Sequence, residues 1–318
     1  MSDIKLFRYG QHGVSELEGK AAMVEKQLQT LIEQQMSAFL GVRFLASEYT
    51  TGKTHKGRID SLGIDENGCP VIIEYKRYSN ENVINQGLFY LDWLLDHQAE
   101  YRWLVMEMLG KEVADSIEWS GTRLLCIAGD FTRYDLHAVQ QINRNVELIR
   151  YKFFGDDLLM LELVNAVTSQ INKPSTPTEL GLPPSIPVSE PVQASNGHVR
   201  TNAERLAAAS PSLRTLYESM CDFIEGLGDE VQRKELKLYT AFKKIRNFVC
   251  VVIASTQQNP HLKLYLNLDP DTVELVEGRI VDARNKGHWG TGDLELTIRH
   301  QQDWEKVIAL IERSYLEN

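Results

Sequence analysis

The chain has 318 residues, of which 43% are hydrophobic and 25% are charged, and its formal net charge is −10. This length suffices for two domains that each bury a hydrophobic core, and the acidic balance argues against a protein that coats nucleic acid through bulk charge. A local basic groove stays compatible with it. The four cysteines form no Cys-x-x-Cys pair, which argues against a disulfide framework and a structural zinc site and favours a reducing interior.

The sequence shows neither the pattern of a signal peptide at its start nor that of a membrane span. The first residues show no basic start followed by an apolar core, and no later apolar run reaches the length that spans a bilayer. We therefore expect a cytoplasmic protein that has no membrane partner.

Residues 1–170 show alternating helix and strand patterns. Apolar residues at helical spacing predict a helix over 20–39, which Gly41 ends. Two strand-like runs around the turn-forming residues 65–68 predict a β-hairpin over 57–76. The order predicts a mixed α/β domain, with further helices over 82–95, 101–117 and 134–142 and strands over 123–129, 146–154 and 158–164.

A proline-rich segment separates this region from the rest. Six of the ten prolines lie between Asn172 and Val192, and almost no periodic apolar pattern is present there. Proline favours extended, semi-rigid geometry, so we interpret residues 171–203 as a linker. Residues 204–318 then predict a smaller α+β domain, in which helices over 212–227 and 303–315 flank a mainly antiparallel sheet.

Three charged residues of the predicted hairpin suggest chemistry. Asp60 lies near the end of the first strand, and Glu74 and Lys76 lie on the second. Residues two apart on a strand face the same side, so Glu74 and Lys76 point together, and strand pairing can bring Asp60 beside them. Two converging carboxylates call for a cation, and hard oxygen ligands suit Mg²⁺ or Mn²⁺ better than zinc.

These residues predict a metal site between Asp60, Glu74 and a backbone carbonyl near Tyr75. A metal ion there would lower the pKa of a water and offset charge on a phosphate, while Lys76 would hold or polarise the attacking water. The pattern alone equally fits a surface pair of Glu74 and Lys76 on an edge strand, with Asp60 in a turn.

The segments GRIDSLGID and VIIEYK resemble the core motif of the PD-(D/E)XK nuclease superfamily, with Asp60, Glu74 and Lys76 in the motif positions. Gln86 and Tyr90 match the Gln-x-x-x-Tyr motif of RecB-like members, and their spacing places both on one helix face. A buried helix face would explain the same pair. The resemblance covers residues 20–165 and implies a restriction-endonuclease-like mixed sheet flanked by helices.

The resemblance also implies that a Glu on the first helix completes the metal site. Glu25 and Glu33 are the candidates, and the surroundings of Glu25 are similar to the corresponding helix start in archaeal mismatch-type endonucleases, so we choose Glu25. A solvated helix residue is the other interpretation of either Glu. Basic residues lie before Asp60 and after Lys76 in the sequence and could bind DNA phosphates; they are Lys53, His55, Lys56, Arg58 and Arg77. A solvated basic loop is the common alternative for such runs.

The C-terminal region is less informative. A run of cations between Arg233 and Arg246, with Tyr239 and Phe242, indicates either a nucleic-acid surface or a solvated sheet edge. His288 and Trp289 lie between glycines, in a loop that could approach a ligand or pack into the core. The region resembles a domain of unknown function found behind nuclease-like domains in proteins called predicted transport proteins, and we expect recognition, dimerisation or regulation from it.

Together these observations predict a divalent-metal-dependent endonuclease that hydrolyses DNA, with Mg²⁺ or Mn²⁺ as cofactor and a homodimer as one possible assembly. The resemblance implies a setting in restriction, antiphage defence or repair. The alternative is a non-catalytic adaptor that binds nucleic acid or protein and retains the nuclease fold.

Overall fold

The computed structural model describes residues 4–10, 13–22, 24–52, 56–77, 83–167, 200–254 and 259–318. Residues 171–199 of the predicted linker therefore lie outside the described residues. We call residues 4–167 the N-terminal part and residues 200–318 the C-terminal part. Among the described residues, no helix combines the length and the apolar character needed to cross a membrane.

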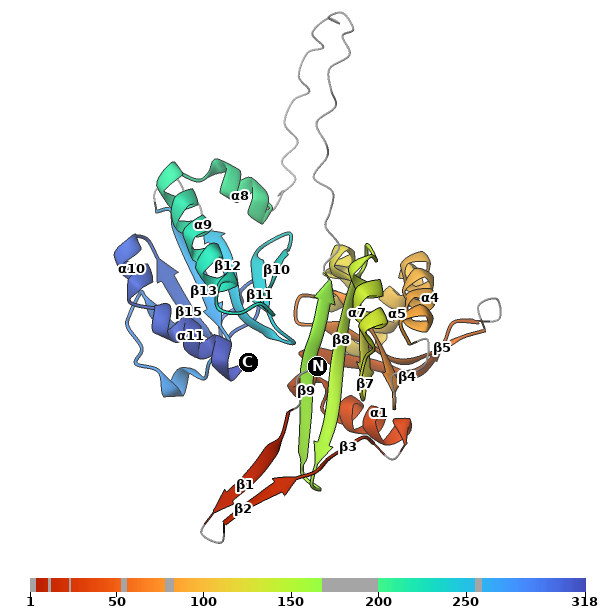
Figure 1. Ribbon diagram of the computed structural model, residues 1–318. Helices are drawn as coiled ribbons and strands as arrows, with labels where there is room; N and C mark the ends of the chain where they lie inside the picture. Colours follow the sequence, from red (N-terminus) through yellow and green to blue (C-terminus); the bar gives the residue numbers. More distant parts are fainter. Residues whose placement is uncertain are drawn as a thin grey trace, which may run out of the picture.

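The described residues of the N-terminal part form one seven-stranded mixed sheet (Figure 1). The strand order is β3-β8-β7-β6-β5-β4, and β9 also pairs with β8. The pairs β6–β7 and β7–β8 are parallel, and the remaining pairs are antiparallel. The strands are β3 (Gly19–Lys20), β4 (Val42–Thr50), β5 (Arg58–Asp65), β6 (Pro70–Lys76), β7 (Arg123–Ala128), β8 (Asn145–Phe154) and β9 (Leu158–Val167).

Helices cover both faces of this sheet, which confirms the predicted mixed α/β fold. Ile72 of β6 packs in the core beneath α4 and α5, whereas its neighbour Ile73 packs in the core beneath α1. A strand that is buried on both faces needs apolar residues at successive positions, as the VII run of β6 provides. The helices are α1 (Glu25–Gln34), α2 (Met36–Leu40), α4 (Val83–Asp96), α5 (Gln98–Leu109), α6 (Lys111–Asp115), η1 (Trp119–Gly121) and α7 (Arg133–Gln140).

The hairpin of β5 and β6 is confirmed, but two predicted helices differ. The helix predicted over 20–39 begins only at Glu25, because Gly19 and Lys20 pair with β8, and it is interrupted at Gln35. The helix predicted over 101–117 is divided at Gly110, whose φ of 93° no α-helix accommodates. Strand β4 was not predicted, although it forms one edge of the sheet.

The C-terminal part contains a six-stranded antiparallel sheet in the order β10-β11-β12-β13-β15-β14, which confirms the predicted α+β class. Its helices pack on one face of the sheet around a core that includes Met220, Phe248 and Trp304. The elements are α8 (Asn202–Ala208), α9 (Pro211–Glu225), β10 (Gln232–Glu235), β11 (Thr240–Lys243), β12 (Asn247–Ala254), β13 (His261–Leu266), η2 (Pro270–Thr272), β14 (Ile280–Asp282), β15 (Leu294–Ile298), α10 (Gln301–Glu305) and α11 (Ile308–Glu317).

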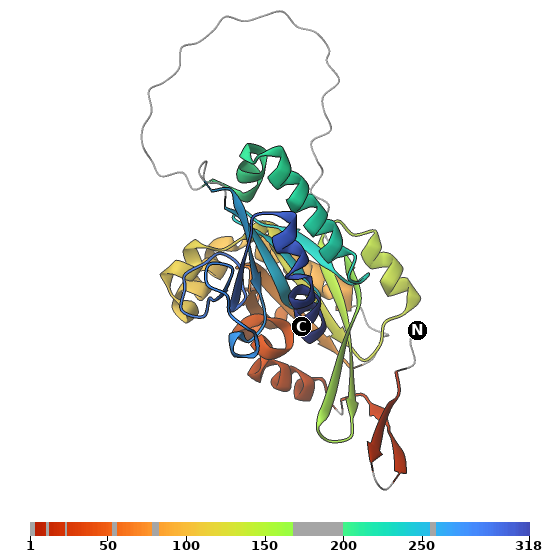
Figure 2. The same cartoon turned by 90° about the vertical axis from the view of Figure 1, so that its left-hand side faces the viewer.

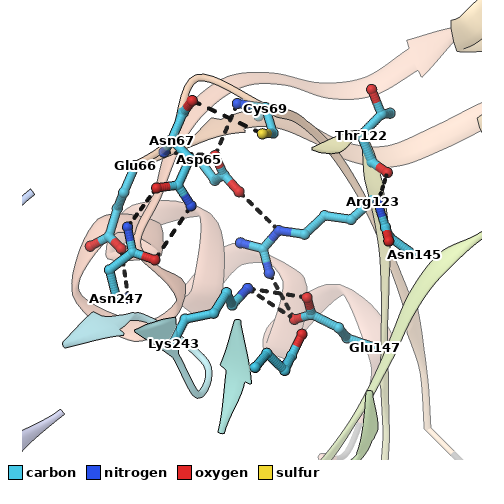
Figure 3. Close-up of polar contacts among 12 residues, drawn as sticks. Asp65, Glu66, Asn67, Cys69, Thr122, Arg123, Asn145, Glu147, Lys243 and Asn247 are labelled. Atoms are coloured by element: carbon cyan, nitrogen blue, oxygen red, sulfur yellow. Dashed lines mark hydrogen bonds and ion pairs between the residues drawn. The ribbon is translucent and has the colours of Figure 1, made fainter. Parts of the chain in front are cut away.

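A buried ionic network joins the two parts (Figure 3). Arg123 at the start of β7 contacts Asp65 at 3.1 Å and Glu147 of β8 at 2.7 Å. Lys243 of β11 reaches across the interface to the same Glu147 at 3.1 Å. Each of these four side chains is at most 5% exposed. Two carboxylates therefore balance two cations in a region from which water is excluded, the arrangement that buried charges need.

The turn between β5 and β6 also lies in this interface. Asn67 accepts hydrogen bonds from the Tyr239 hydroxyl at 3.0 Å and from Asn247 Nδ2 at 2.7 Å. The Asn247 backbone N–H donates to Glu66 at 2.9 Å, and burial raises the pKa of Glu66. The C-terminal part thus holds the hairpin at its turn.

This interface corrects both interpretations of the basic run between Arg233 and Arg246 for the residues of the run that it buries. Lys243 and Phe242 are buried, and Arg246 donates to the Ala38 carbonyl at 3.1 Å. Lys243 and Phe242 therefore belong neither to a nucleic-acid surface nor to a solvated edge, whereas Lys237 of the same run is exposed.

A separate two-stranded hairpin projects from the N-terminal part in both Figures 1 and 2. It consists of β1 (Leu6–Gly10) and β2 (Gly13–Leu17), which pair only with each other among the described residues. Its side chains Phe7, Tyr9 and Val14 are exposed.

Candidate active site

Asp60 and Glu74 lie beside each other on the two strands of the hairpin. The pairing of Ser61 with Ile73 places Asp60 opposite Glu74 in the next position of the register. The Asp60 backbone N–H donates to Glu74 Oε1 at 3.2 Å, and the Tyr75 backbone N–H donates to Asp60 Oδ2 at 3.0 Å. These reciprocal contacts hold both carboxyl groups at the ends of two central strands.

The environment disfavours negative charge on both groups. Glu74 is fully buried, and its Oε2 atom has no hydrogen-bond partner among the residues that the structure describes. Burial, with the nearby Asp60 carboxylate, raises the pKa of Glu74 to about 9. Burial also raises the pKa of Asp60. A pair of one buried and one partly buried carboxyl group is costly when both ionise unless a cation joins it, which is typical of sites that bind metal ions or transfer protons.

The donor set fits a hard divalent cation in its chemistry, because the two carboxylates supply oxygen ligands and the orphaned Glu74 Oε2 lacks a partner. The predicted ligands from this pair and the Tyr75 carbonyl would leave room for water, as Mg²⁺ prefers. Within the described ranges, no group of three or more His, Cys, Asp or Glu side chains converges on a metal position. A third protein carboxylate is therefore not in place in this arrangement.

Glu25 lies against the end of β6 and contacts Lys76. Its Oε1 is 3.6 Å from Lys76 Nζ, and its Oε2 accepts the Arg77 backbone N–H at 3.0 Å. The Lys76 side chain is 14% exposed, so it is largely enclosed near the carboxylates. In this arrangement Glu25 orients Lys76 and the strand end rather than facing Asp60 and Glu74 as a ligand.

Glu33, the alternative to Glu25, lies in a different network. It accepts from the Ser61 hydroxyl at 2.6 Å and from Gln29 at 2.9 Å. The Ser61 hydroxyl also lies 3.2 Å from the Tyr75 hydroxyl, from which it can accept, and both residues face α1, on the side of the sheet opposite Asp60 and Glu74. Glu33 therefore contacts β5 on the face of the sheet that α1 covers, not on the face of Asp60 and Glu74.

Gln86 and Tyr90 of α4 act on the start of β5. The Tyr90 hydroxyl accepts the Arg58 backbone N–H at 3.2 Å and the Gln86 side chain at 3.3 Å. The Tyr90 ring lies so close to Gly57 that a Cβ there would be 2.4 Å from a ring carbon. Tyr90 thus contacts the start of the strand that carries Asp60, and Gln86 contacts the Tyr90 hydroxyl, so both have a positioning role.

The predicted cations have different environments. Lys53 and His55 lie outside the described residues. Lys56, Arg58 and Arg77 are exposed, and Arg58 contacts Glu48 at 2.5 Å. Exposed cationic side chains therefore lie on both sides of the carboxylates in the sequence, with Arg58 before Asp60 and Arg77 after Lys76.

Glu48 of β4 was missed from the sequence. The pairs Ser47–Ser61 and Tyr49–Ile59 place it level with Asp60, so three neighbouring strands carry a carboxylate in one row. Its pKa is lowered by hydrogen bonding to Lys26, and its φ is 53°, unusual for a residue other than glycine. No sequence pattern marks such a conformation, because the strand itself has no clear alternation.

Comparisons with known proteins place parts of the chain. Residues 203–318 match a family model described as a domain of unknown function, DUF5655. An uncharacterized protein of Haemophilus influenzae is 28% identical over 316 residues, which cover 98% of this chain and 99% of that protein.

Two solved structures are also similar. A repair endonuclease from Pyrococcus abyssi is matched with a TM-score of 0.27, and an EndoMS–dsDNA2 complex with a TM-score of 0.25. Both are 19% identical, and each match covers 43% of this chain. The chain spans half the length of these solved chains, at 50% in both.

Proposed function

We propose that the N-terminal part hydrolyses phosphodiester bonds in DNA with the help of a divalent metal ion, at a site formed by Asp60, Glu74 and Lys76. The observation that carries this proposal is the fully buried Glu74, whose Oε2 has no partner among the described residues and which lies beside the partly buried carboxyl group of Asp60. An unsatisfied buried carboxylate oxygen costs free energy, so its retention calls for a ligand that satisfies it. The resemblance of the motif to PD-(D/E)XK nucleases supports the same assignment.

In this proposal Asp60, Glu74 and the Tyr75 carbonyl hold Mg²⁺ or Mn²⁺. The bound ion supplies positive charge to the phosphate and lowers the pKa of a water. Burial of the carboxylates keeps competing water away from the reacting phosphate and strengthens each charged contact.

Lys76 is the proposed catalytic cation. Its ammonium donates hydrogen bonds to the attacking water or to a phosphate oxygen, where it offsets developing charge. Glu25 Oε1 lies 3.6 Å from Lys76 Nζ, so Glu25 is a positioning residue for this ammonium. Lys56, Arg58 and Arg77 bind the flanking phosphates, which fixes the register of the DNA without reading its sequence.

Cleavage assays with purified protein test the proposal. Supercoiled plasmid and labelled single- and double-stranded oligonucleotides of DNA and RNA are incubated with Mg²⁺, Mn²⁺ or EDTA. Wild-type protein cuts DNA only with a metal ion, and Asp60→Ala and Lys76→Met lose the activity while their circular dichroism spectra are unchanged. Asp92→Ala, an exposed carboxylate on α4, is the matched control and retains activity.

Cleavage by Asp60→Ala at the wild-type rate, or no cleavage of DNA by the wild-type protein with either metal, would contradict the proposal. Nucleic-acid binding that persists in EDTA and is unchanged in Asp60→Ala, without any cleavage, would instead support the adaptor. Analytical ultracentrifugation of the active protein tests the expected homodimer separately.

A further inference from the structure

The C-terminal part contains a hollow of about 590 Å³ that the proposed nuclease reaction does not use. A second hollow of about 620 Å³ lies between the two parts and shares the loop residues His288 and Trp289 with the first. The first hollow combines cations, aromatic rings and an apolar floor: Arg205, Val252, Lys263, Tyr265, His288 and Trp289.

This hollow lies away from the proposed active site. The second hollow includes Asn67 and Gly68 of the β5–β6 turn, at the other end of β5 from Asp60. Five residues along a strand separate Asp60 from Asp65, a distance of roughly 17 Å at the usual rise per residue. A ligand in the hollow would therefore occupy a site of its own.

Trp289 is exposed yet held in a fixed loop. Its side chain is 39% exposed, and the Arg205 guanidinium lies 4.2 Å from the ring centroid. The Thr291 backbone N–H donates to Cys250 Sγ at 3.3 Å, and a Cβ on Gly290 would lie 2.6 Å from the Cβ of Cys250. The loop is thus packed against β12 directly after Trp289, so the ring is presented with little freedom to lose on binding.

Arg205 places a guanidinium on this hollow. Among the described residues no carboxylate lies within ion-pair distance of its guanidinium, and partial burial lowers its pKa. Lys263, on the same hollow, is already paired with Glu295 at 3.1 Å. A guanidinium in this position offers a planar set of donors that suits a phosphate group.

A second stacked pair lies beside Trp289. The His288 ring is 4.2 Å from the Tyr265 ring, with an angle of 13° between their planes. The hollow therefore combines planar stacking surfaces with one unpaired cation. Nucleotides match this combination, because a base stacks on aromatic rings and its phosphate binds arginine.

We propose that this hollow binds a nucleotide unit, with the base stacked against the exposed part of the Trp289 ring and the phosphate bound by Arg205. The ligand is either a free mononucleotide or one unit of a single-stranded nucleic acid, since the recognised chemistry is the same. The proposal concerns binding alone and does not depend on the metal site.

Binding measured in EDTA with the full chain tests this proposal, because no cleavage occurs without metal. The probes are a short fluorescein-labelled single-stranded DNA, followed by anisotropy, and deoxyadenosine monophosphate, followed by calorimetry. Trp289→Ala and Arg205→Ala weaken binding of at least one probe by about fivefold or more, a typical loss for a base-stacking contact. Trp289→Phe retains most of the affinity, because it keeps a stacking ring.

Matched controls are Trp103→Ala, an exposed tryptophan of α5, and Arg144→Ala, an exposed arginine of the N-terminal part. Loss of affinity in Arg205→Ala and Trp289→Ala supports the site, whether it is seen for both probes, for the DNA alone or for the mononucleotide alone. Which probe loses affinity identifies the source of the nucleotide. The proposal is overturned if wild-type protein binds neither probe, or if Arg205→Ala and Trp289→Ala bind as tightly as the controls while only their melting temperatures fall.

Discussion

Removal of Glu147 should weaken the contact between the two parts far more than removal of an ordinary surface carboxylate. Glu147 is 1% exposed and neutralises Arg123 at 2.7 Å and Lys243 at 3.1 Å. In Glu147→Ala, Asp65 still pairs with Arg123, whereas Lys243 keeps no carboxylate within ion-pair distance among the described residues. Breaking a buried ion pair by removing one partner costs about 3–5 kcal/mol, and we expect Glu147→Ala to fall in this range.

A second substitution separates the ion pair from simple cavity formation. In Glu147→Ala, Lys243 is a buried cation without its partner, so Lys243→Met should recover part of the lost stability. The double variant should lose about 1–3 kcal/mol less free energy of unfolding than the sum of the two single losses, which is the usual size of coupling between residues in contact. Glu112→Ala, an exposed carboxylate of α6, is the control and changes stability by about 0.5 kcal/mol or less.

Urea unfolding followed by circular dichroism and tryptophan fluorescence provides the measurement, with acid dependence as a further readout. Although burial opposes ionisation, Arg123 and Lys243 outweigh it and hold the pKa of Glu147 below its ordinary value. The wild-type stabilisation is therefore present above the ordinary Glu pKa and is lost as the pH falls through the lower folded value. Strictly additive single losses, or a Glu147→Ala cost equal to that of Glu112→Ala, would refute this reasoning.

Three further predictions concern the proposed active site. Burial raises the pKa of Glu74 to about 9, so the stability of the wild-type protein relative to Glu74→Gln should fall as the pH rises toward that value. At neutral pH without metal, the inactive Glu74→Gln variant should therefore melt at a higher temperature than the wild-type protein. An equal or lower melting temperature of the variant contradicts this prediction. Gly57→Ala should lower the cleavage rate by about a hundredfold, because the alanine Cβ would press on the Tyr90 ring and displace the strand that carries Asp60. An unchanged rate in single-turnover kinetics would count against this prediction. Arg58→Ala should weaken DNA binding and lower the slope of log affinity against log salt by about one. Lys76→Met should lose cleavage even at saturating DNA. Identical effects of the two substitutions on binding and on cleavage would argue against separate roles.

The central hairpin was predictable because its chemistry and its turn agree. Alternation places Glu74 and Lys76 on one side of a strand, and the Asp-Glu-Asn-Gly turn brings Asp60 level with them. The choice between Glu25 and Glu33 was less accessible, since both lie on one helix. Their surroundings separate them only in three dimensions, where Glu33 contacts Ser61 behind the sheet.

The interface was not predictable from local patterns. Lys243 lies in a run of cations that looks solvated, and only the distant Glu147 explains its burial. Glu48 was missed for a similar reason, because its left-handed backbone and its place beside Asp60 depend on the register of β4 with β5. Contacts between residues far apart in sequence decide both cases.

The position of the β5–β6 turn limits how the protein can be divided. The turn holds Glu66 and Asn67, which bind Asn247, while the proposed catalytic carboxylates lie at the opposite ends of the same two strands. A fragment ending before residue 200 would contain every proposed catalytic residue. It would also expose the Glu147 network to water without the lysine that completes it. The boundary suggested by the proline-rich segment is therefore a poor place to truncate this protein for biochemical work.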